Sequence, residues 1–230
     1  MALNRYINIL VVFSLVCCSR TNSIDPNNHF PPGDKRYLHV FSTDCSIMDI
    51  NAYYELNGYD LRKQESDDEV TAKDIIFDVR INGEEIEQDP DIHSLVLQYY
   101  QERTIWKEGT IGVPFDIIYK QSFCKGIRIK ADKTLFGQKS GTNLSEFFTF
   151  YAGNYNYFDS YIVTGTREIV PIVTGMTIQE YLSYNPYALS EAAFIFKELP
   201  EELPIEVTFD FTMIFDDLES LEQSIKMRLR

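Results

Sequence analysis

The stretch that decides the fold class is Ile205-Glu206-Val207-Thr208-Phe209-Asp210-Phe211-Thr212-Met213. Large apolar residues occupy its odd positions and polar residues occupy its even positions, without a break over the nine residues. Successive side chains of a β-strand point to opposite faces of the sheet. This period of two therefore predicts a strand with one buried face.

Alternation of the same kind recurs along the chain, between short turns rich in Gly, Asn and Pro. The further strands that it predicts are residues 37–41, 48–56, 75–81, 115–123, 127–131, 161–163 and 169–173. Asn57-Gly58 and Asn82-Gly83 carry the strongest two-residue turn signal. Pro171 marks an edge or a bulge, because proline cannot donate to a strand ladder. Residues 93–106 fit a strand or a short helix, since apolar residues recur there at both periods.

Two short segments break the strand pattern in the same way. In 141–148 and 175–182 an aliphatic residue and two large apolar residues stand at helical spacing, with a Glu between them. Asn143 and Thr177 each precede that Glu by three positions, where a helix N-cap belongs. Both segments are expected to form helices of one to two turns that close the open ends of a sheet pair.

Many short strands without a long amphipathic helix predict an all-β, mainly antiparallel fold. The favoured architecture is a β-sandwich of immunoglobulin-like subtype, with one or two short helices. Residues 37–230 are expected to form a single sandwich domain, and two small β subdomains are the alternative.

The N-terminus predicts export. Residues 1–17 have one positive charge followed by an apolar run that is too short to span a bilayer, which is the layout of a signal peptide. The run closes with Leu15-Val16-Cys17-Cys18, which resembles the lipobox of bacterial lipoproteins. The resemblance implies that Cys18 is the lipidated first residue of the mature chain. The alternatives are an ordinary signal peptide cut a few residues later and an uncleaved apolar N-terminus. Residues 18–36 are polar and rich in Asn, Ser, Pro and Gly, and are expected to form a flexible tether.

A lipobox, a polar tether and an all-β body together resemble the uncharacterised envelope lipoproteins of Bacteroidetes-type bacteria. The resemblance rests on residues 15–18 and more loosely on the remainder. It implies a lipid-anchored location at the bacterial cell envelope, on the periplasmic face or at the cell surface, with the membrane as a partner through the N-terminal lipid.

Cys45 and Cys124 are the cysteines that remain for the folded part. Export permits a disulfide between them, because oxidising compartments preserve such bonds. Two buried free thiols are the alternative.

Composition and motifs exclude several functions. The chain is 44% hydrophobic and carries a formal net charge of −14, so it repels nucleic-acid backbones. Its three histidines are far apart, and no catalytic, metal-binding or phosphate-binding motif is present, so neither an enzyme nor a cofactor is expected. Ser122-Phe-Cys-Lys125 matches a Ser-x-x-Lys pattern by letters only, and the carboxylate pair Asp216-Asp217 identifies nothing by itself.

One aromatic segment suggests a binding surface. Among small polar residues it contains Tyr151, Tyr155, Tyr157, Phe158 and Tyr161. Tyrosines on a polar loop stack on sugars or fill pockets of a protein partner, whereas the alternative is that they fill the core. The sequence thus favours a non-catalytic binding module for a glycan or an envelope protein. A structural component of the envelope is the first alternative, and a hydrolase with an unrecognised carboxylate site is the second.

Overall fold

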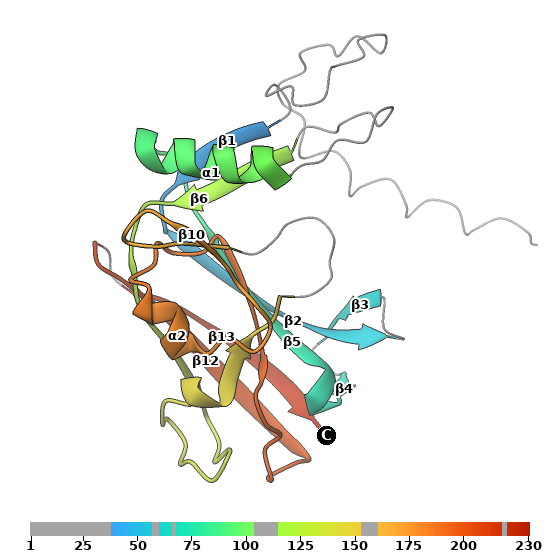
Figure 1. Cartoon of the computed structure of the whole chain (residues 1–230). Coiled ribbons are helices and arrows are strands. Elements are labelled where there is room, and N and C mark those ends of the chain that lie inside the picture. Colours follow the sequence, from blue (N-terminus) through green and yellow to red (C-terminus); the bar gives the residue numbers. More distant parts are fainter. Residues whose placement is uncertain (1–37, 57–59, 66–67, 104–114, 153–160, 218–219) are drawn as a thin grey trace, which may run out of the picture.

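The computed structural model describes residues 38–56, 60–65, 68–103, 115–152, 161–217 and 220–230. The signal peptide 1–17, the lipidation site Cys18 and the tether 18–36 lie outside the described residues. The described part consists mainly of strands, most of them antiparallel, with two α-helices (Figure 1). The predicted all-β fold with few helices is therefore confirmed.

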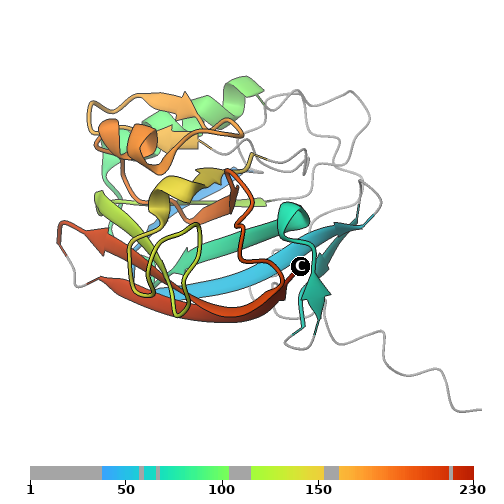
Figure 2. The same cartoon turned by 90° about the horizontal axis from the view of Figure 1, so that it is seen from below.

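Two main sheets form the body of the molecule. The five-stranded sheet has the order β3 (Asp60–Lys63), β2 (Ile47–Leu56), β5 (Ile75–Asn82), β11 (Glu191–Phe196) and β8 (Phe148–Phe150). The four-stranded sheet has the order β4 (Glu69–Val70), β13 (Leu221–Leu229), β12 (Ile205–Phe215) and β7 (Cys124–Ala131). From below, β12 and β13 form one layer under β2 and β5 (Figure 2).

The two sheets share an aromatic core. Phe77 of β5 lies 5.3 Å from the Phe209 ring and 5.4 Å from the Phe211 ring of β12, measured between centroids. All three side chains are buried, as the alternation along residues 205–213 predicts. The polar Glu206 and Asp210 on the opposite face of β12 are exposed. The sheets thus pack face to face as a sandwich.

A second, smaller core lies at one end of the sandwich. Here β1 (Leu38–Thr43) pairs in parallel with β6 (Phe115–Lys120), and β9 (Tyr161–Val163) pairs with β10 (Ile169–Pro171). Helix α1 (Pro90–Arg103) runs along β1 and β6 (Figure 1). This settles the ambiguous segment 93–106 as helical over its described residues. Pro171 ends β10, which pairs only with β9 among the described strands, so the proline occupies an edge.

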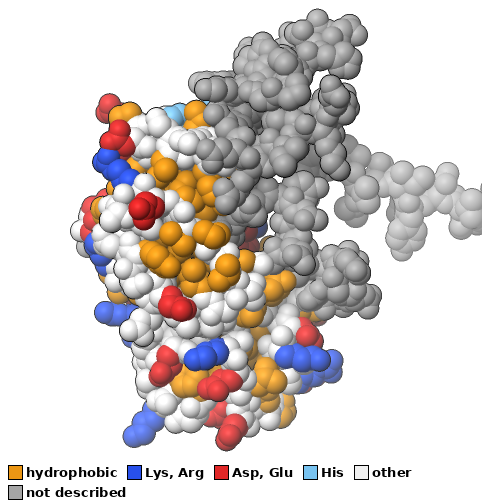
Figure 3. All heavy atoms as spheres, viewed as in Figure 1, with side chains coloured by type: hydrophobic (Ala, Val, Ile, Leu, Met, Phe, Trp, Pro, Cys, Tyr) orange, Lys and Arg blue, Asp and Glu red, His pale blue; other side chains and the backbone are white. Residues whose placement is uncertain are grey.

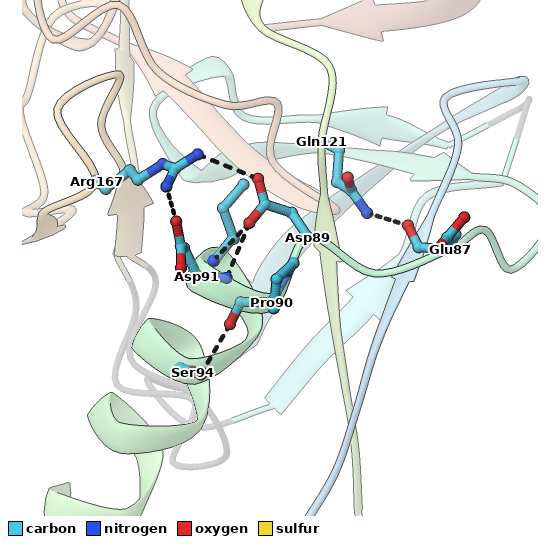
Figure 4. A network of polar contacts seen from close by, with 8 residues as sticks. Glu87, Asp89, Pro90, Asp91, Ser94, Gln121 and Arg167 are labelled. Carbon is cyan, nitrogen blue, oxygen red and sulfur yellow. Dashed lines mark hydrogen bonds and ion pairs between the residues drawn. The ribbon is translucent and has the colours of Figure 1, made fainter.

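A polar network joins α1 to the turn between β9 and β10. Arg167 of that turn donates to the carboxylates of Asp89 and Asp91 (Figure 4). Asp89 Oδ1 also accepts the backbone N–H groups of Asp91, at 2.9 Å, and Ile92, at 3.3 Å. Asp89 therefore satisfies the first turn of α1 as an N-cap residue does, while it holds the arginine.

Of the two predicted short helical segments, only one forms an α-helix. Residues 178–183 form α2 (Ile178–Ser183), and Thr177 caps it as predicted. In the other segment only a 3₁₀ turn forms, η3 (Ser145–Phe147), and a second such turn, η2 (Ala72–Asp74), precedes β5. Asn143 does not cap a helix in the expected way, because its side-chain oxygen accepts the backbone N–H of Ile129 in β7 and that of Ser145.

Candidate functional site

Of the predicted aromatic contacts, Tyr155, Tyr157 and Phe158 lie outside the described residues. Tyr161 packs in the second core, with its ring centroid 5.0 Å from that of Tyr99 and 5.6 Å from that of Tyr100. Burial raises the pKa of Tyr161 well above its usual value. Tyr161 thus has a packing role, which is the alternative that the sequence left open.

The two cysteines are buried free thiols, so the structure contains no disulfide between Cys45 and Cys124. Burial raises the pKa of Cys45, and it raises the pKa of Cys124 to about 11. Neither thiol is a ready nucleophile, because the thiolate is the reactive form and burial disfavours it.

Tyr151, the first of the predicted aromatics, is half-buried and donates its backbone N–H to the carbonyl of Ala193.

Lys120 is the most conspicuous buried polar side chain. It is 1% exposed and donates to Thr43 Oγ1 at 2.6 Å and to the Asp44 carbonyl at 2.7 Å. Burial lowers its pKa. These bonds tie β6 to the end of β1, and the side chain is inaccessible to a substrate, so its role is structural.

The Ser-x-x-Lys match and the Asp216-Asp217 pair have structural roles as well. Ser122 Oγ donates to Asp217 at 3.0 Å, and Asp216 accepts the backbone N–H of Phe123 at 2.9 Å. Lys125 donates instead to Asn185 and lies over the Phe123 ring. Within the described ranges no group of three His, Cys, Asp or Glu residues is arranged to hold a metal ion.

Exposed apolar side chains gather between α1 and α2, over the region of β10 (Figure 3). The large hydrophobic residues that are exposed in the described structure are Ile47, Ile86, Ile118, Val173, Tyr184 and Leu199. Single exposed side chains of this kind are normal in soluble proteins. No helix in the described ranges is long and apolar enough to cross a membrane.

The side of the five-stranded sheet that faces away from the sandwich core, here called the outer face, carries a charged cluster. Three strands meet there in register, with Arg80 of β5 opposite Asp49 of β2 and Glu191 of β11. One step along, Asp78 of β5 stands opposite Asn51 and Ala193. Acidic and basic groups from segments far apart in the sequence are thereby brought together.

Arg80 holds two carboxylates at once. Its Nε donates to Asp78 Oδ2 at 3.0 Å, and its Nη2 lies 3.4 Å from Glu191 Oε1. The side chains of Arg80 and Glu191 are 49% and 60% exposed, whereas that of Asp78 is only 8% exposed. The second oxygen of Asp78, Oδ1, is buried and has no hydrogen-bond partner.

The protonation of Asp78 is shifted strongly. Burial, followed by repulsion from Glu191, raises the pKa of Asp78 to about 6, although Arg80 acts in the opposite direction. Removing a carboxylate from water disfavours its charged form, and a second carboxylate nearby adds to that effect. Titratable groups shifted in this way concentrate at functional sites. We therefore take Asp78, Arg80 and Glu191 as the candidate functional site.

This cluster offers polar recognition more readily than catalysis. A buried oxygen without a partner needs a donor, and the exposed side of Arg80 supplies donors beside it. Tyr53, a half-buried residue, lies on the same face opposite Ile76. The arrangement suits a ligand that both donates and accepts hydrogen bonds.

No protein-family profile matches the chain, and neither a curated protein nor a solved structure is significantly similar to it.

The sequence predicts only part of the candidate site. Alternation with Phe77 and Val79 places Asp78 and Arg80 on the polar face of their strand. Residues 191–196 show no such alternation, since Ala192, Ala193 and Phe194 follow one another, and their strand was not predicted. Without β11 the sequence could not bring Glu191 beside Arg80 or indicate that Asp78 is buried.

Proposed function

We propose that the chain is an exported protein anchored to the cell envelope through lipidated Cys18, and that its β-sandwich is a non-catalytic binding module. The outer face of the five-stranded sheet is the binding surface, and its partner is a glycan or another envelope protein. The lipobox at residues 15–18 supports the anchor. The net charge of −14 disfavours nucleic acid as the partner.

One observation carries the binding proposal, namely the exposed Arg80 that holds the carboxylates of Asp78 and Glu191 on the outer face. Its bonds to these two carboxylates engage two of the five N–H groups of the guanidinium, and the exposed side of Arg80 leaves the others within reach of a partner. A purely structural component of the envelope is the alternative role.

The anchor is tested at the mature N-terminus. Mass spectrometry of the purified chain is expected to show that it begins at Cys18 and carries acyl chains. Substitution of Cys18→Ala is expected to abolish the acyl mass, and Cys17→Ala serves as the matched control that leaves it unchanged. An N-terminus elsewhere, or a Cys18 without acyl mass, would refute the anchor.

The binding surface is tested by cosedimentation of the full chain, purified in detergent, with isolated cell-envelope fragments. Arg80→Glu is expected to reduce the bound fraction severalfold, because it reverses the one basic group of the cluster. Lys226→Glu, which lies exposed on the four-stranded sheet, is the matched control and is expected to bind as the unsubstituted chain does. Equal binding by all three proteins would refute the outer face as the surface.

A hydrolase is the second candidate, and the raised pKa of Asp78 favours it. A carboxyl group with a pKa of about 6 beside a second carboxylate resembles the acid of a glycosidase pair. Against this, the Asp78 side chain is 8% exposed and one of its oxygens is held by Arg80. Release of reducing sugar from cell-wall polysaccharide by the unsubstituted chain, lost in Asp78→Asn, would establish the hydrolase in place of the binding module.

A further inference from the structure

We propose that Asp78 and Glu191 share one proton in mildly acidic surroundings, and that loss of this proton makes the outer face more negative and weakens its hold on the partner. The regulatory half of this inference rests on the proposed function, since it concerns the same face. The shared proton itself requires no partner. It follows from the geometry around Arg80, from the unpartnered oxygen of Asp78 and from the charge of the cluster.

Arg80 fixes the two carboxylates side by side. It stands directly opposite Glu191 in the β5–β11 register, and Asp78 lies two positions away on the same face of β5. Arg80 Nε donates to Asp78 Oδ2 at 3.0 Å and Nη2 donates to Glu191 Oε1 at 3.4 Å, so one guanidinium orients both acids. The two carboxyl groups approach closely enough that a bond between them favours the protonated form of Asp78. The pair therefore has the arrangement of two acids that hold one proton between them.

The oxygen without a partner needs a donor that occupies almost no space. Asp78 Oδ1 is buried and the side chain is 8% exposed, so no ligand group reaches it. Two ionised carboxylates cannot bond to each other, because both only accept hydrogen bonds. One added proton turns either acid into a donor to the other. The proton thus supplies the bond that the cluster lacks, and it needs no cleft to arrive.

Charge favours uptake of the proton. With both acids ionised, the two carboxylates and the guanidinium carry a net negative charge in a partly buried position. A single proton makes the cluster neutral. Burial, followed by repulsion from Glu191, raises the pKa of Asp78 to about 6, and two acids that interact in this way titrate as a pair. The proton is therefore exchanged between about pH 5 and about pH 7.5.

Other titratable groups lie near the cluster or respond to the same pH range. Those that project on the same face from the neighbouring strands are Asp49 and Tyr53 on β2 and Lys63 on β3. The histidines of the described structure, His39 and His93, lie on β1 and α1, beside the second core. Histidines commonly change charge in this interval. Variants of the acid pair separate the two sources, because they leave the histidines in place.

Protonation should strengthen the outer face as a binding surface. The remaining N–H groups of Arg80 attract acceptor groups of a partner, whereas the two ionised carboxylates repel them. Neutralising one carboxylate removes part of this repulsion, so the bound fraction is expected to be severalfold higher at pH 5 than at pH 7.5. The effect stays moderate because the charge changes beside exposed groups, which solvent and salt screen.

Carbon-13 NMR of the full chain in detergent tests the shared proton. The side-chain carboxyl carbons of Asp78 and Glu191, assigned with Asp78→Asn and Glu191→Gln, are followed from pH 4 to pH 8. Both are expected to shift with a common midpoint near pH 6. In Glu191→Gln the Asp78 midpoint should fall, because the repulsion and the bond to the second acid are lost. Glu206→Gln is the matched control and should leave the midpoint unchanged, because hydrogen bonds from Lys226 and Arg228 lower the pKa of Glu206 to about 2.

Cosedimentation with cell-envelope fragments at pH 5 and pH 7.5 tests the effect on binding. The unsubstituted chain is expected to bind severalfold better at pH 5. Asp78→Asn and Glu191→Gln each fix the charge of the cluster and keep Arg80. Both should bind equally at the two pH values, at the level that the unsubstituted chain reaches at pH 5. Glu206→Gln should retain the pH dependence.

The outcomes separate this inference from the broader function. Separate midpoints for the two carboxyl groups, or no midpoint between pH 5 and pH 7, overturn the shared proton. Binding of the unsubstituted chain that is equal at both pH values, or that changes equally in both pair variants, overturns the regulation. In either case the broader function stands as long as binding still depends on Arg80. A common midpoint together with binding that Arg80→Glu does not reduce supports the shared proton and refutes the outer face as the surface.

Folding of the variants is checked by circular-dichroism melting curves. Asp78 is buried, so Asp78→Asn is the variant more prone to lose the fold. The Glu191 side chain is 60% exposed, and Glu191→Gln then carries both tests alone.

Discussion

Asp78 shows how an acidic residue at a polar strand position becomes buried. Ile76, Asp78 and Arg80 share the outer face of β5, yet only Arg80 is exposed, while Ile76 and Asp78 are 7% and 5% exposed. The carboxyl group therefore favours its neutral form in the folded state. Its folded pKa of about 6 lies above its usual value of 3.8, so its contribution to stability is full below about pH 4 and is lost as pH rises through 6.

The first prediction follows from the upward direction of the Asp78 pKa shift. In the unsubstituted chain the ionisation of Asp78 should lower the free energy of unfolding between pH 4.5 and pH 7.5 by about 2 kcal/mol, at 1.4 kcal/mol per pKa unit over the part of the shift that lies in this interval. Asp78→Asn removes the titration, so its unfolding free energy should depend less steeply on pH across that interval. Urea denaturation at both pH values measures the difference. Identical pH dependence in the two proteins would contradict the raised pKa.

Gly83 supports a second prediction at the scale of one residue. The Asn82-Gly83 pair suggests a turn, but in the structure the backbone of Gly83 lies so close to Asp44 that there is no room for a side chain. A Cβ at position 83 would lie 1.9 Å from Asp44 Oδ1 and 2.3 Å from the Asp44 carbonyl oxygen. Since the backbone oxygen cannot move aside easily, Gly83→Ala should destabilise the fold by about 1–3 kcal/mol or more in urea denaturation.

Gly126→Ala is the matched control for this prediction. A Cβ there would meet the flexible end of the Ile214 side chain at 3.2 Å, which can shift to make room. Its effect should be clearly smaller than that of Gly83→Ala. Equal effects of the two substitutions would mean that the contact with Asp44 does not determine the need for glycine at position 83.

At the scale of elements, α2 begins with the N-terminal cap that its local sequence predicts. Thr177 Oγ1 accepts the backbone N–H of Glu180 at 3.1 Å, and the Glu180 carboxylate accepts the backbone N–H of Thr177 at 2.7 Å. The backbone N–H of Thr177 and then its hydroxyl, which both donate to the carboxylate, hold the pKa of Glu180 below its usual value. All the partners lie within three residues, and for that reason the capping box was predictable.

Removing this cap is the third prediction. Thr177→Ala should lower the free energy of unfolding by about 1 kcal/mol, because one N-terminal N–H of α2 loses its acceptor. Thr142→Ala, at an exposed loop position in the corresponding segment, is the control and should change stability by less than about 0.5 kcal/mol. Equal losses in thermal or urea unfolding would show that the capping box contributes nothing.

Residues 141–148 and the unpredicted strands show that local sequence patterns do not determine every element. Asn143 stands at the same offset as Thr177, but it bonds to Ile129 on β7, so the segment forms only a 3₁₀ turn. Strand β13 was missed although Ile225, Met227 and Leu229 alternate, because most of its other residues are polar. Its register against β12 places most of those polar residues opposite the polar residues of β12, on the outward face of the sheet, where they are exposed. The spacing of residues along the chain does not show that a distant strand will bond to a side chain in place of its local partner.

At the scale of the whole molecule, two cores are joined by a few polar bonds. Ser190 Oγ donates to the carbonyl of Ile118 in β6, while the Ser190 carbonyl accepts the N–H of Ile81 in the sandwich. Arg167 holds the start of α1 to the β9–β10 turn within the second core. The second core is smaller than the sandwich core and should open more easily.

The fourth prediction concerns this opening. Arg167→Ala should speed amide hydrogen exchange in α1 by up to about fivefold, because exposed ion pairs contribute only weakly to stability. Exchange in β12, in the sandwich core, should not change. Lys226→Ala, which removes an exposed ion pair to Glu206 on the sandwich, is the control and should leave α1 unaffected. Equal acceleration in α1 and β12 would indicate that the two cores open as one unit.

The sequence by itself determined the all-β class, the faces of the strongly alternating strands and the cap of α2. These features depend on side-chain periods and contacts within a few residues, which local spacing encodes directly. Tertiary structure alone decided the order of the strands, the helical state of residues 90–103 and the site at Asp78. Arg80 and Glu191 are 111 positions apart and become neighbours only when β5 and β11 pair. Such pairing depends on the closure of the whole sheet, and so does the burial that raises the pKa of Asp78.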